Sequence, residues 1–334
     1  MEKEVPERGY ADSEGKSQDG EDKRKTPQEG RKGKEEKRRE RAGAASGSRV
    51  LPCMPGSGID GCQRKQKEIA GEYKMDYILE CCVDSVESAL AAAEGGADRL
   101  ELCAALMIGG ISPGLALFEQ VKACCDLPVR VLLRPRFGDF LYTDYEFRML
   151  RREAEMFREA GAEGIVIGCL REDGSLHGER MKELVQVAGS MKITLHRAFD
   201  VCADPLEAYR QAGELGIDTV LTSGQEKDCL TGLPLLKKLS SLQKETGGPR
   251  IMAGAGVTPE VIRKFLACTE ITDYHLSAKR VVESGMRYRK EGVPMGLPAM
   301  DEYSIFRTDG RIVAEARACL QNAWAELQAG TVHK

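Results

Sequence analysis

Two glutamate–cysteine pairs with the same spacing are the residues of this sequence best suited to chemistry. Glu80 is followed two positions later by Cys82, and Glu101 is followed two positions later by Cys103. Clusters of acidic residues and cysteines are candidates for functional sites, and the repetition of the pair favours that interpretation. The alternative is that both cysteines are small core residues and that both glutamates pair with structural arginines.

The segments around these pairs predict the elements that position them. Tyr77–Val83 is an apolar run of strand length, a helix with Asp84 or Ser85 as its N-cap follows, and Arg99–Cys103 forms the next strand. Side chains alternate along a strand, so each Glu shares a face with its own Cys. Because a helical crossover makes the two strands parallel, about 4.8 Å apart, we expect the pairs to lie side by side.

The rest of the chain repeats this alternation of strand and helix. Six further strands are predicted, at Val129–Arg134, Gly164–Gly168, Lys192–His196, Thr219–Ser223, Ile251–Gly254 and Tyr274–Ser277. Eight strands alternating with helices predict an α/β protein with a single closed (β/α)8 TIM barrel at residues 75–330. An open doubly wound sheet is the alternative, but it usually carries a glycine-rich turn after its first strand, where this chain has V-D-S-V.

The two ends of the chain differ from this repeat. Residues 312–327 are amphipathic and predict an extra C-terminal helix, and the long polar connection at 279–309 predicts a lid or an oligomer arm. Residues 1–74 hold 18 Lys/Arg and 15 Asp/Glu with few aliphatic residues, which predicts a disordered charged tail. The folded domain is predicted to start near Met75. Because acids are interspersed among the bases, we predict no nucleic-acid binding.

The composition bounds the class of protein. The 12 cysteines show neither a disulfide framework nor a CxxC zinc spacing, which favours reduced thiols in a cytoplasmic protein. No signal-peptide pattern and no apolar run of about 18 residues occurs, so we predict no membrane association. With 334 residues, of which 42% are hydrophobic, the chain can bury one large core or two smaller ones.

Polar residues gather at the predicted carboxyl ends of the later strands, where barrels carry their functional groups. His196, in H-R-A-F-D, is either a packed core histidine or the best general acid–base candidate. Arg134 and Arg136 share parity, and either neutralises the glutamates or binds an anionic substrate. We expect Glu80, Glu101, Arg134 and His196 to form one charge network, because glutamates on adjacent strands need a cation between them.

A phosphate cradle is a further candidate. The turn G-A-G-V-T-P, with Gly254 and Gly256, either binds an anion through its backbone or is a tight turn, and Ser277 would complete the cradle. The complete set of predicted substrate-binding residues is Arg136, Asp200, Ser223, Gly254, Gly256 and Ser277. Schiff-base and zinc chemistry fit poorly, because the sixth strand offers Thr222-Ser223 in place of a lysine and the acids and histidines form no compact ligand set. No nucleotide cofactor is predicted.

Seven motifs together resemble those of the CutC copper-homeostasis family. They occur in the same order between Tyr77 and Ala323: L-E-C-C-V-D-S-V-E-S-A, G-G-A-D-R-L-E-L-C-A-A, R-P-R-F-G-D-F-L-Y, L-H-R-A-F-D-V, L-T-S-G-Q, I-M-A-G-A-G-V and G-M-R-Y-R. The third motif usually reads R-P-R-G-G-D-F in the family, and Phe137 replaces its first Gly here.

The resemblance implies a (β/α)8 barrel, a cytoplasmic location and a homo-oligomer, either a dimer or a tetramer. It also implies a role in copper homeostasis, with Cu(I) bound by Cys82 and Cys103, whose thiolates are the soft ligands that this ion prefers. The alternative function is a TIM-barrel enzyme that acts on a small anionic substrate, phosphorylated or not, at the barrel mouth. Its catalytic candidates are Glu80, Glu101, Arg134 and His196.

Overall fold

Eight parallel strands close into a barrel in the computed structural model, which describes residues 77–290, 292–293, 295 and 301–329. The strands follow one another around the barrel in chain order, and the last pairs with the first. Their bounds are β1 Ile78–Val83, β2 Arg99–Leu102, β3 Val129–Leu132, β4 Gly164–Ile167, β5 Lys192–Leu195, β6 Thr219–Thr222, β7 Arg250–Ala253 and β8 Asp273–Leu276. The predicted fold is confirmed.

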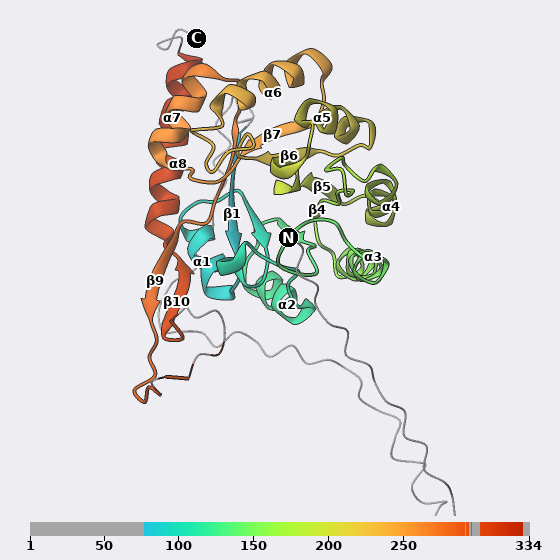
Figure 1. Ribbon diagram of the computed structural model, residues 1–334. Coiled ribbons are helices and arrows are strands. Elements are labelled where there is room, and N and C mark those ends of the chain that lie inside the picture. The colour runs from blue at the N-terminus through green and yellow to red at the C-terminus, as the bar shows by residue number, and fades with distance from the viewer. Residues whose placement is uncertain (1–76, 291, 294, 296–300, 330–334) are drawn as a thin grey trace, which may run out of the picture. The chain divides into compact units, whose positions relative to one another are not determined.

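Helices cover the outside of the barrel (Figure 1). Their bounds are α1 Val86–Glu94, α2 Leu115–Cys124, α3 Asp144–Glu159, α4 Gly178–Ala188, α5 Pro205–Glu214, α6 Leu233–Thr246 and α7 Pro259–Cys268, with short 3-10 turns η1 Leu106–Ile108 and η2 Arg197–Val201. Several helices begin at side-chain caps. At the start of α1, Ser85 accepts a hydrogen bond from Ser88 N, so Ser85 is the N-cap of the two predicted candidates. Thr143 and Glu146 form a capping box at the start of α3.

The hydrophobic core lies between the strands and the helices. Alternate strand residues point outward into this layer, as Leu79, Cys81 and Val83 do along β1, and all three are fully buried. The barrel interior is more polar. Arg130 on β3 donates hydrogen bonds in this interior to the hydroxyls of Thr194 on β5 and Thr219 on β6. Strand alternation thus separates an apolar layer from an interior able to hold charged groups.

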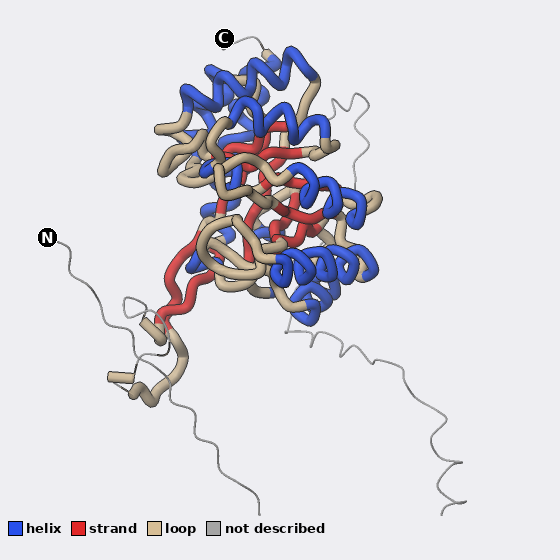
Figure 2. Tube along the Cα trace, turned by 45° about the vertical axis from the view of Figure 1, so that its right-hand side comes forward, coloured by secondary structure: helices blue, strands red, loops and turns tan. Residues whose placement is uncertain are grey.

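The C-terminal part adds a two-stranded ribbon and a helix to the barrel. β9 (Lys279–Glu283) pairs antiparallel with β10 (Ser304–Thr308), and the ribbon projects away from the barrel body (Figures 1 and 2). α8 (Gly310–Gln328) lies along α7 and α1, which confirms the predicted extra helix. Its Trp324 meets Tyr77, just before β1, edge to face with ring centroids 5.7 Å apart.

The connection predicted at 279–309 therefore contains ordered strands. The signals for them are the adjacent Val281 and Val282 and the alternating segment S-I-F-R-T, which the long polar context obscures. The predicted tail at 1–74 and the domain start at Met75 lie outside the described residues. Within the described part of the chain, none of the helices has the length and apolar character needed to cross a bilayer.

Candidate functional site

The register between β1 and β2 brings the two cysteines to the carboxyl ends of adjacent strands. Cys82 lies opposite Glu101, and the backbone N–H of Cys103 donates to Val83 O at 3.0 Å. Each Glu faces the barrel interior with its own Cys, as predicted from alternation. Cys82 is 5% exposed and borders the mouth, whereas Cys103 is fully buried against Leu132 and Val166. The two thiols therefore lie at different depths.

Glu80 is held by two cations that come from the neighbouring strands. Arg99 on β2 donates to Glu80 Oε2 through its Nε, and His275 on β8 places Nδ1 2.8 Å from Glu80 Oε1. Both partners lie opposite Glu80 in the strand register. One ligand atom each from Glu80, Glu101 and His275 lie within 4.8 Å of one another, so the prediction that the acids and histidines form no compact ligand set is wrong for these three residues. The cluster spans the closure of the barrel, where β8, β1 and β2 meet.

These contacts shift the acid–base properties of the cluster in opposite directions. Burial raises the pKa of Glu80, but the charge of Arg99 and the hydrogen bond from His275 outweigh it, so the net pKa lies well below the usual value. Burial raises the pKa of Glu101 to about 7, with a lowering effect of His275 and a raising effect of Glu80. Burial lowers the pKa of His275, but the raising effects of Cys82, Glu101 and Glu80 are larger in sum. The net pKa therefore lies well above the usual value.

The same cluster forms one side of a cavity of about 390 Å³ at the barrel mouth. Glu101, His275 and Cys82 line it together with Arg134 and His196. Apolar side chains supply much of the remaining wall: Leu106, Ile108, Leu132, Phe140, Val201 and Leu221. The predicted catalytic candidates Glu101, Arg134 and His196 thus share one cavity, and Glu80 lies beneath it through its contact with His275.

The predicted charge network is wrong in its cations. Arg134 donates to the carbonyls of Gly109, Gly110 and Gly138 and forms no ion pair with either glutamate among the described residues. His196 accepts a hydrogen bond from Ala198 N at Nδ1, 3.1 Å away, as the cap of η2. Arg99 and His275 take the place that we predicted for Arg134 and His196, because the strand register sets them beside Glu80.

His196 is a neutral ring in the wall of the first cavity. Burial, together with the charge of Arg134, lowers the pKa of His196 to about 3. Since Nδ1 accepts from Ala198 N, the proton of the neutral ring lies on Nε2. Nε2 is buried and has no hydrogen-bond partner within the described chain, and the same holds for Arg134 Nε and Glu101 Oε2.

The six predicted substrate-binding residues divide between several places. Gly256 and Ser277 line a second cavity of about 490 Å³ at the ends of β7 and β8, which shares Cys82 and His275 with the first. Asp200 lines the first cavity, and Ser223 N donates to its carboxylate at 3.0 Å. Neither Ser223, Gly254 nor Arg136 lines the first or the second cavity.

Arg136 and Gly254 have structural contacts that account for them. Arg136 Nε donates to Glu146 at 2.6 Å and its Nη2 donates to Asp139 at 2.8 Å, on a half-exposed loop. A Cβ at Gly254 would lie 2.5 Å from Leu221 Cδ1, so close packing requires glycine there. The shared parity of Arg134 and Arg136 therefore does not place both in the cavity, because β3 ends at Leu132 and alternation ceases beyond it.

Sequence reasoning missed Arg99 as a member of the site and gave His275 no role. Arg99 begins β2, at the end of the strand opposite to the mouth, where a charged residue usually reads as solvent-exposed. Alternation along β8 could have placed the His275 side chain inside the barrel. Its neighbour Tyr274 points outward and contacts Phe265, so His275 points inward. Its proximity to Glu80 depends on which strands close the barrel, and the sequence alone leaves that pairing implicit.

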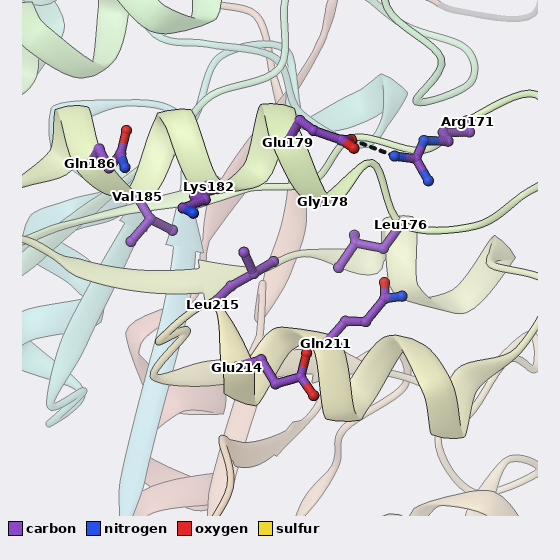
Figure 3. A pocket seen from close by; sticks show the side chains of 10 residues that line it. All are labelled: Arg171, Leu176, Gly178, Glu179, Lys182, Val185, Gln186, Gln211, Glu214 and Leu215. Carbon is purple, nitrogen blue, oxygen red and sulfur yellow. Dashed lines mark hydrogen bonds and ion pairs between the residues drawn. The ribbon is translucent and has the colours of Figure 1, made fainter.

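A third cavity, of about 620 Å³, lies in the outer layer between α4 and α5 (Figure 3). Arg171 pairs with Glu179 at one end, and Val185 and Leu215 form an apolar part of the wall. None of its lining residues belongs to either mouth cavity. Its mixed side chains include no cluster that resembles a catalytic or metal-binding set.

The thiols are the donors in this region that suit Cu(I). Both are free, and the Sγ atoms of Cys82 and Cys103 lie 3.7 and 3.6 Å from the carbonyls of Leu276 and Val83, respectively. Thiolates bind Cu(I) in preference to carboxylates, which suit harder ions. Burial raises the pKa of the Cys103 thiol far above its usual value, and Cys82 and Glu101 add to the effect, so binding of a metal there would have to displace a proton.

Comparison with known proteins agrees with this fold and these motifs. The family model described as "CutC family" matches residues 77–280. A family protein CutC from Edwardsiella ictaluri is 43% identical over 73% of this chain and 95% of its own length. The copper homeostasis protein cutC homolog from Homo sapiens is 39% identical over 74% of this chain and 90% of its own.

A solved structure supports the same fold. The chain of CutC from Streptococcus agalactiae superposes with a TM-score of 0.56 at 23% identity, and the match covers 60% of this chain and 98% of that one. The sequence matches extend over the barrel that carries Cys82, Cys103 and both cavities. The chain described here belongs to the CutC family.

Proposed function

We propose that this protein acts in copper homeostasis by binding Cu(I) through Cys82 and Cys103. The observation that carries the proposal is the placement of two free thiols at the carboxyl ends of adjacent parallel strands, joined by the bond from Cys103 N to Val83 O. The name of the human relative, a copper homeostasis protein, supports the same function. Two soft sulfur ligands are what Cu(I) prefers among protein donors.

The surroundings of the thiols set how such binding would depend on pH. Cu(I) binds thiolates, and Cys103 is a thiol at neutral pH because its pKa is raised. Binding then releases protons, and affinity rises with pH. Burial and the charge of Glu101 oppose thiolate formation at Cys103, and Cys82 and Asp84 add to that effect. Anaerobic competition against a Cu(I) chelator, with a variant that lacks both thiols, tests this function.

A second candidate function is catalysis on a small anionic substrate in the first cavity. The observation in its favour is Glu101, whose buried Oε2 has no partner within the described chain and which borders the same cavity as His275 and His196. A carboxyl in that position can transfer a proton to or from a bound molecule. Glu101→Gln keeps the shape and removes the proton, so it should abolish turnover while leaving Cu(I) binding at the thiols in place.

We further propose a homo-oligomer in the cytoplasm. The β9–β10 ribbon exposes Val281 and Ile305, at 57% and 36%, on a projecting sheet with open edges that another chain can cover. Cys82, Cys103 and the other buried cysteines of the described chain are free thiols, which suits a reducing compartment.

A further inference from the structure

Arg134 is a buried cation that lacks an anionic partner. The residue is 8% exposed, and its guanidinium donates to three backbone carbonyls, of Gly109, Gly110 and Gly138. No carboxylate of the described chain forms an ion pair with it, although Glu101 borders the same cavity. Burying a charge without a counter-charge is costly, and native structures usually answer it with an ion pair or a ligand.

A second donor accompanies this cation. His196 is 5% exposed, and its Nε2–H, like Arg134 Nε–H, is buried without a hydrogen-bond partner in the part of the chain that the structure covers. Phe140 connects the two side chains: its ring lies 4.8 Å from the imidazole, centroid to centroid, and 5.0 Å from Arg134 Cζ. Phe140, Arg134 and His196 all line the first cavity.

We infer that the first cavity binds a small organic monocarboxylate, whose two head-group oxygens accept hydrogen bonds from Arg134 Nε–H and His196 Nε2–H. The inference deepens the second candidate function and rests on it, because it names the substrate class of the same cavity. One cationic and one neutral donor match a head group with a single negative charge. A planar carboxylate has two oxygens for these two free donors.

The cavity wall distinguishes a carboxylate from inorganic phosphate. Phosphate carries a larger charge and more oxygens, and it is usually bound by several backbone N–H groups or several cations. Here the wall includes the acids Glu101 and Asp200, which would repel the larger charge of phosphate, and Arg197, which pairs with Asp200. It also includes the apolar side chains of Leu106, Leu132, Phe140 and Leu221. The body of the ligand therefore contacts hydrocarbon, and its carboxylate contacts the two donors. At about 390 Å³ the cavity has room for a small organic acid.

The test measures equilibrium binding to the full-length protein, without turnover. Butyrate and benzoate are the probes, butyramide and benzamide are their uncharged counterparts, and inorganic phosphate is the rival anion. Ligand-observed NMR titration, with thermal shift as a second readout, gives the affinities. We expect each carboxylate to bind at least about tenfold more tightly than its amide, the scale of one hydrogen bond to a charged group.

Two variants and one control assign the donors. Arg134→Gln should weaken butyrate binding at least about tenfold. His196→Asn should weaken it as well, because its side-chain oxygen can still accept from Ala198 N while the donor toward the cavity is removed. Arg151→Gln removes the same charge from the half-exposed outer face of α3 and should change nothing. If Arg134→Gln fails to fold, His196→Asn and the amide comparison still decide the outcome.

The remaining outcomes separate the proposals. Equal binding of carboxylates and amides, tighter binding of phosphate, or no carboxylate binding up to tens of millimolar would overturn the assignment. Carboxylate binding by the wild type that Arg134→Gln and His196→Asn weaken would support the inference whether or not a reaction is found, so failure of the catalytic function alone would leave this result unchanged. Carboxylate binding by Arg134→Gln and by His196→Asn equal to that of the wild type would place the ligand away from the two donors and contradict the inference.

Discussion

His275 Nδ1 lies 2.8 Å from Glu80 Oε1, across the pairing of β8 with β1 that closes the barrel. The contact joins the last strand to the first inside the interior, and Arg99 holds the other oxygen of Glu80 from β2. Side chains from β8, the last strand of the barrel, and from β2, the strand after β1, thus meet at the carboxylate of Glu80. The stability of the closure and the chemistry of the mouth depend on the same residues.

Glu80→Gln should destabilise the fold strongly. The substitution leaves the charge of Arg99 buried without its counter-charge, and removing one partner of a buried pair costs about 3–5 kcal/mol. Urea denaturation followed by circular dichroism measures the change in the free energy of unfolding. Arg210→Gln, which removes one partner of an exposed pair with Glu207, is the control and should cost less than about 1 kcal/mol. Equal costs for the two variants would show that the closure cluster carries no special stability.

Glu101 should make the stability fall as pH rises. Its pKa is about 7 in the fold against an ordinary value of 4.5, so the folded protein holds a proton that the unfolded chain has released. The wild type therefore loses stability as the pH rises from 4.5 to about 7. Glu101→Gln has no titrating proton at this position and should not show this loss. The stability of the variant relative to wild type should increase by on the order of 3 kcal/mol across that window. Parallel pH profiles of the two proteins would contradict the raised pKa.

His196 should have the opposite pH signature. Its pKa falls to about 3 in the fold from an ordinary 6.5, so the unfolded chain takes up a proton that the folded protein refuses. Stability contributed by the neutral ring is present above 6.5 and is lost as pH falls toward 3. At pH 5 the loss is about 2 kcal/mol relative to pH 7, and His196→Asn should lack it. Unfolding measured at both pH values for both proteins gives the difference.

The β9–β10 ribbon should carry the contact between copies. Val281→Asp places a charge on the projecting sheet. If the wild type is the proposed dimer or tetramer, we expect light scattering to show a smaller particle for the variant, because a buried unpaired charge is costly. Met149→Asp, at a half-exposed position on α3, is the matched control and should keep the wild-type mass. An unchanged mass for Val281→Asp would remove the ribbon from the interface.

The sequence predicts the barrel well and the site in part. Alternation places Glu80, Cys82, Glu101 and Cys103 on the interior face, because period-two geometry depends only on local backbone. It does not predict that His275 and Arg99 are the cations beside Glu80, since those contacts depend on the stagger of strands around a closed barrel. Alternation also fails beyond the end of β3, where Arg136 turns away from the cavity to Glu146.

The depth of the two thiols is likewise set by tertiary packing. Cys82 borders both mouth cavities, while Cys103 is covered by Leu132, Val166 and Leu106. Identical Glu-x-Cys spacing gives no indication of this difference, which arises because β2 ends at Leu102 and its neighbour β3 supplies a large side chain over the thiol. Reactivity of the two cysteines should therefore differ, with Cys82 modified first by a small alkylating reagent.

The most direct test of the copper function is anaerobic competition against a Cu(I) chelator. The wild type should bind at least about tenfold more tightly than the Cys82→Ser, Cys103→Ser protein, a difference of about 1.4 kcal/mol. Its affinity should rise with pH, because binding displaces the proton that the raised pKa of Cys103 retains. A Cys124→Ser variant, altered at a half-buried cysteine at the end of α2, is the control and should match wild type. Equal Cu(I) affinities of the wild type and the double variant would contradict the assignment of copper to Cys82 and Cys103.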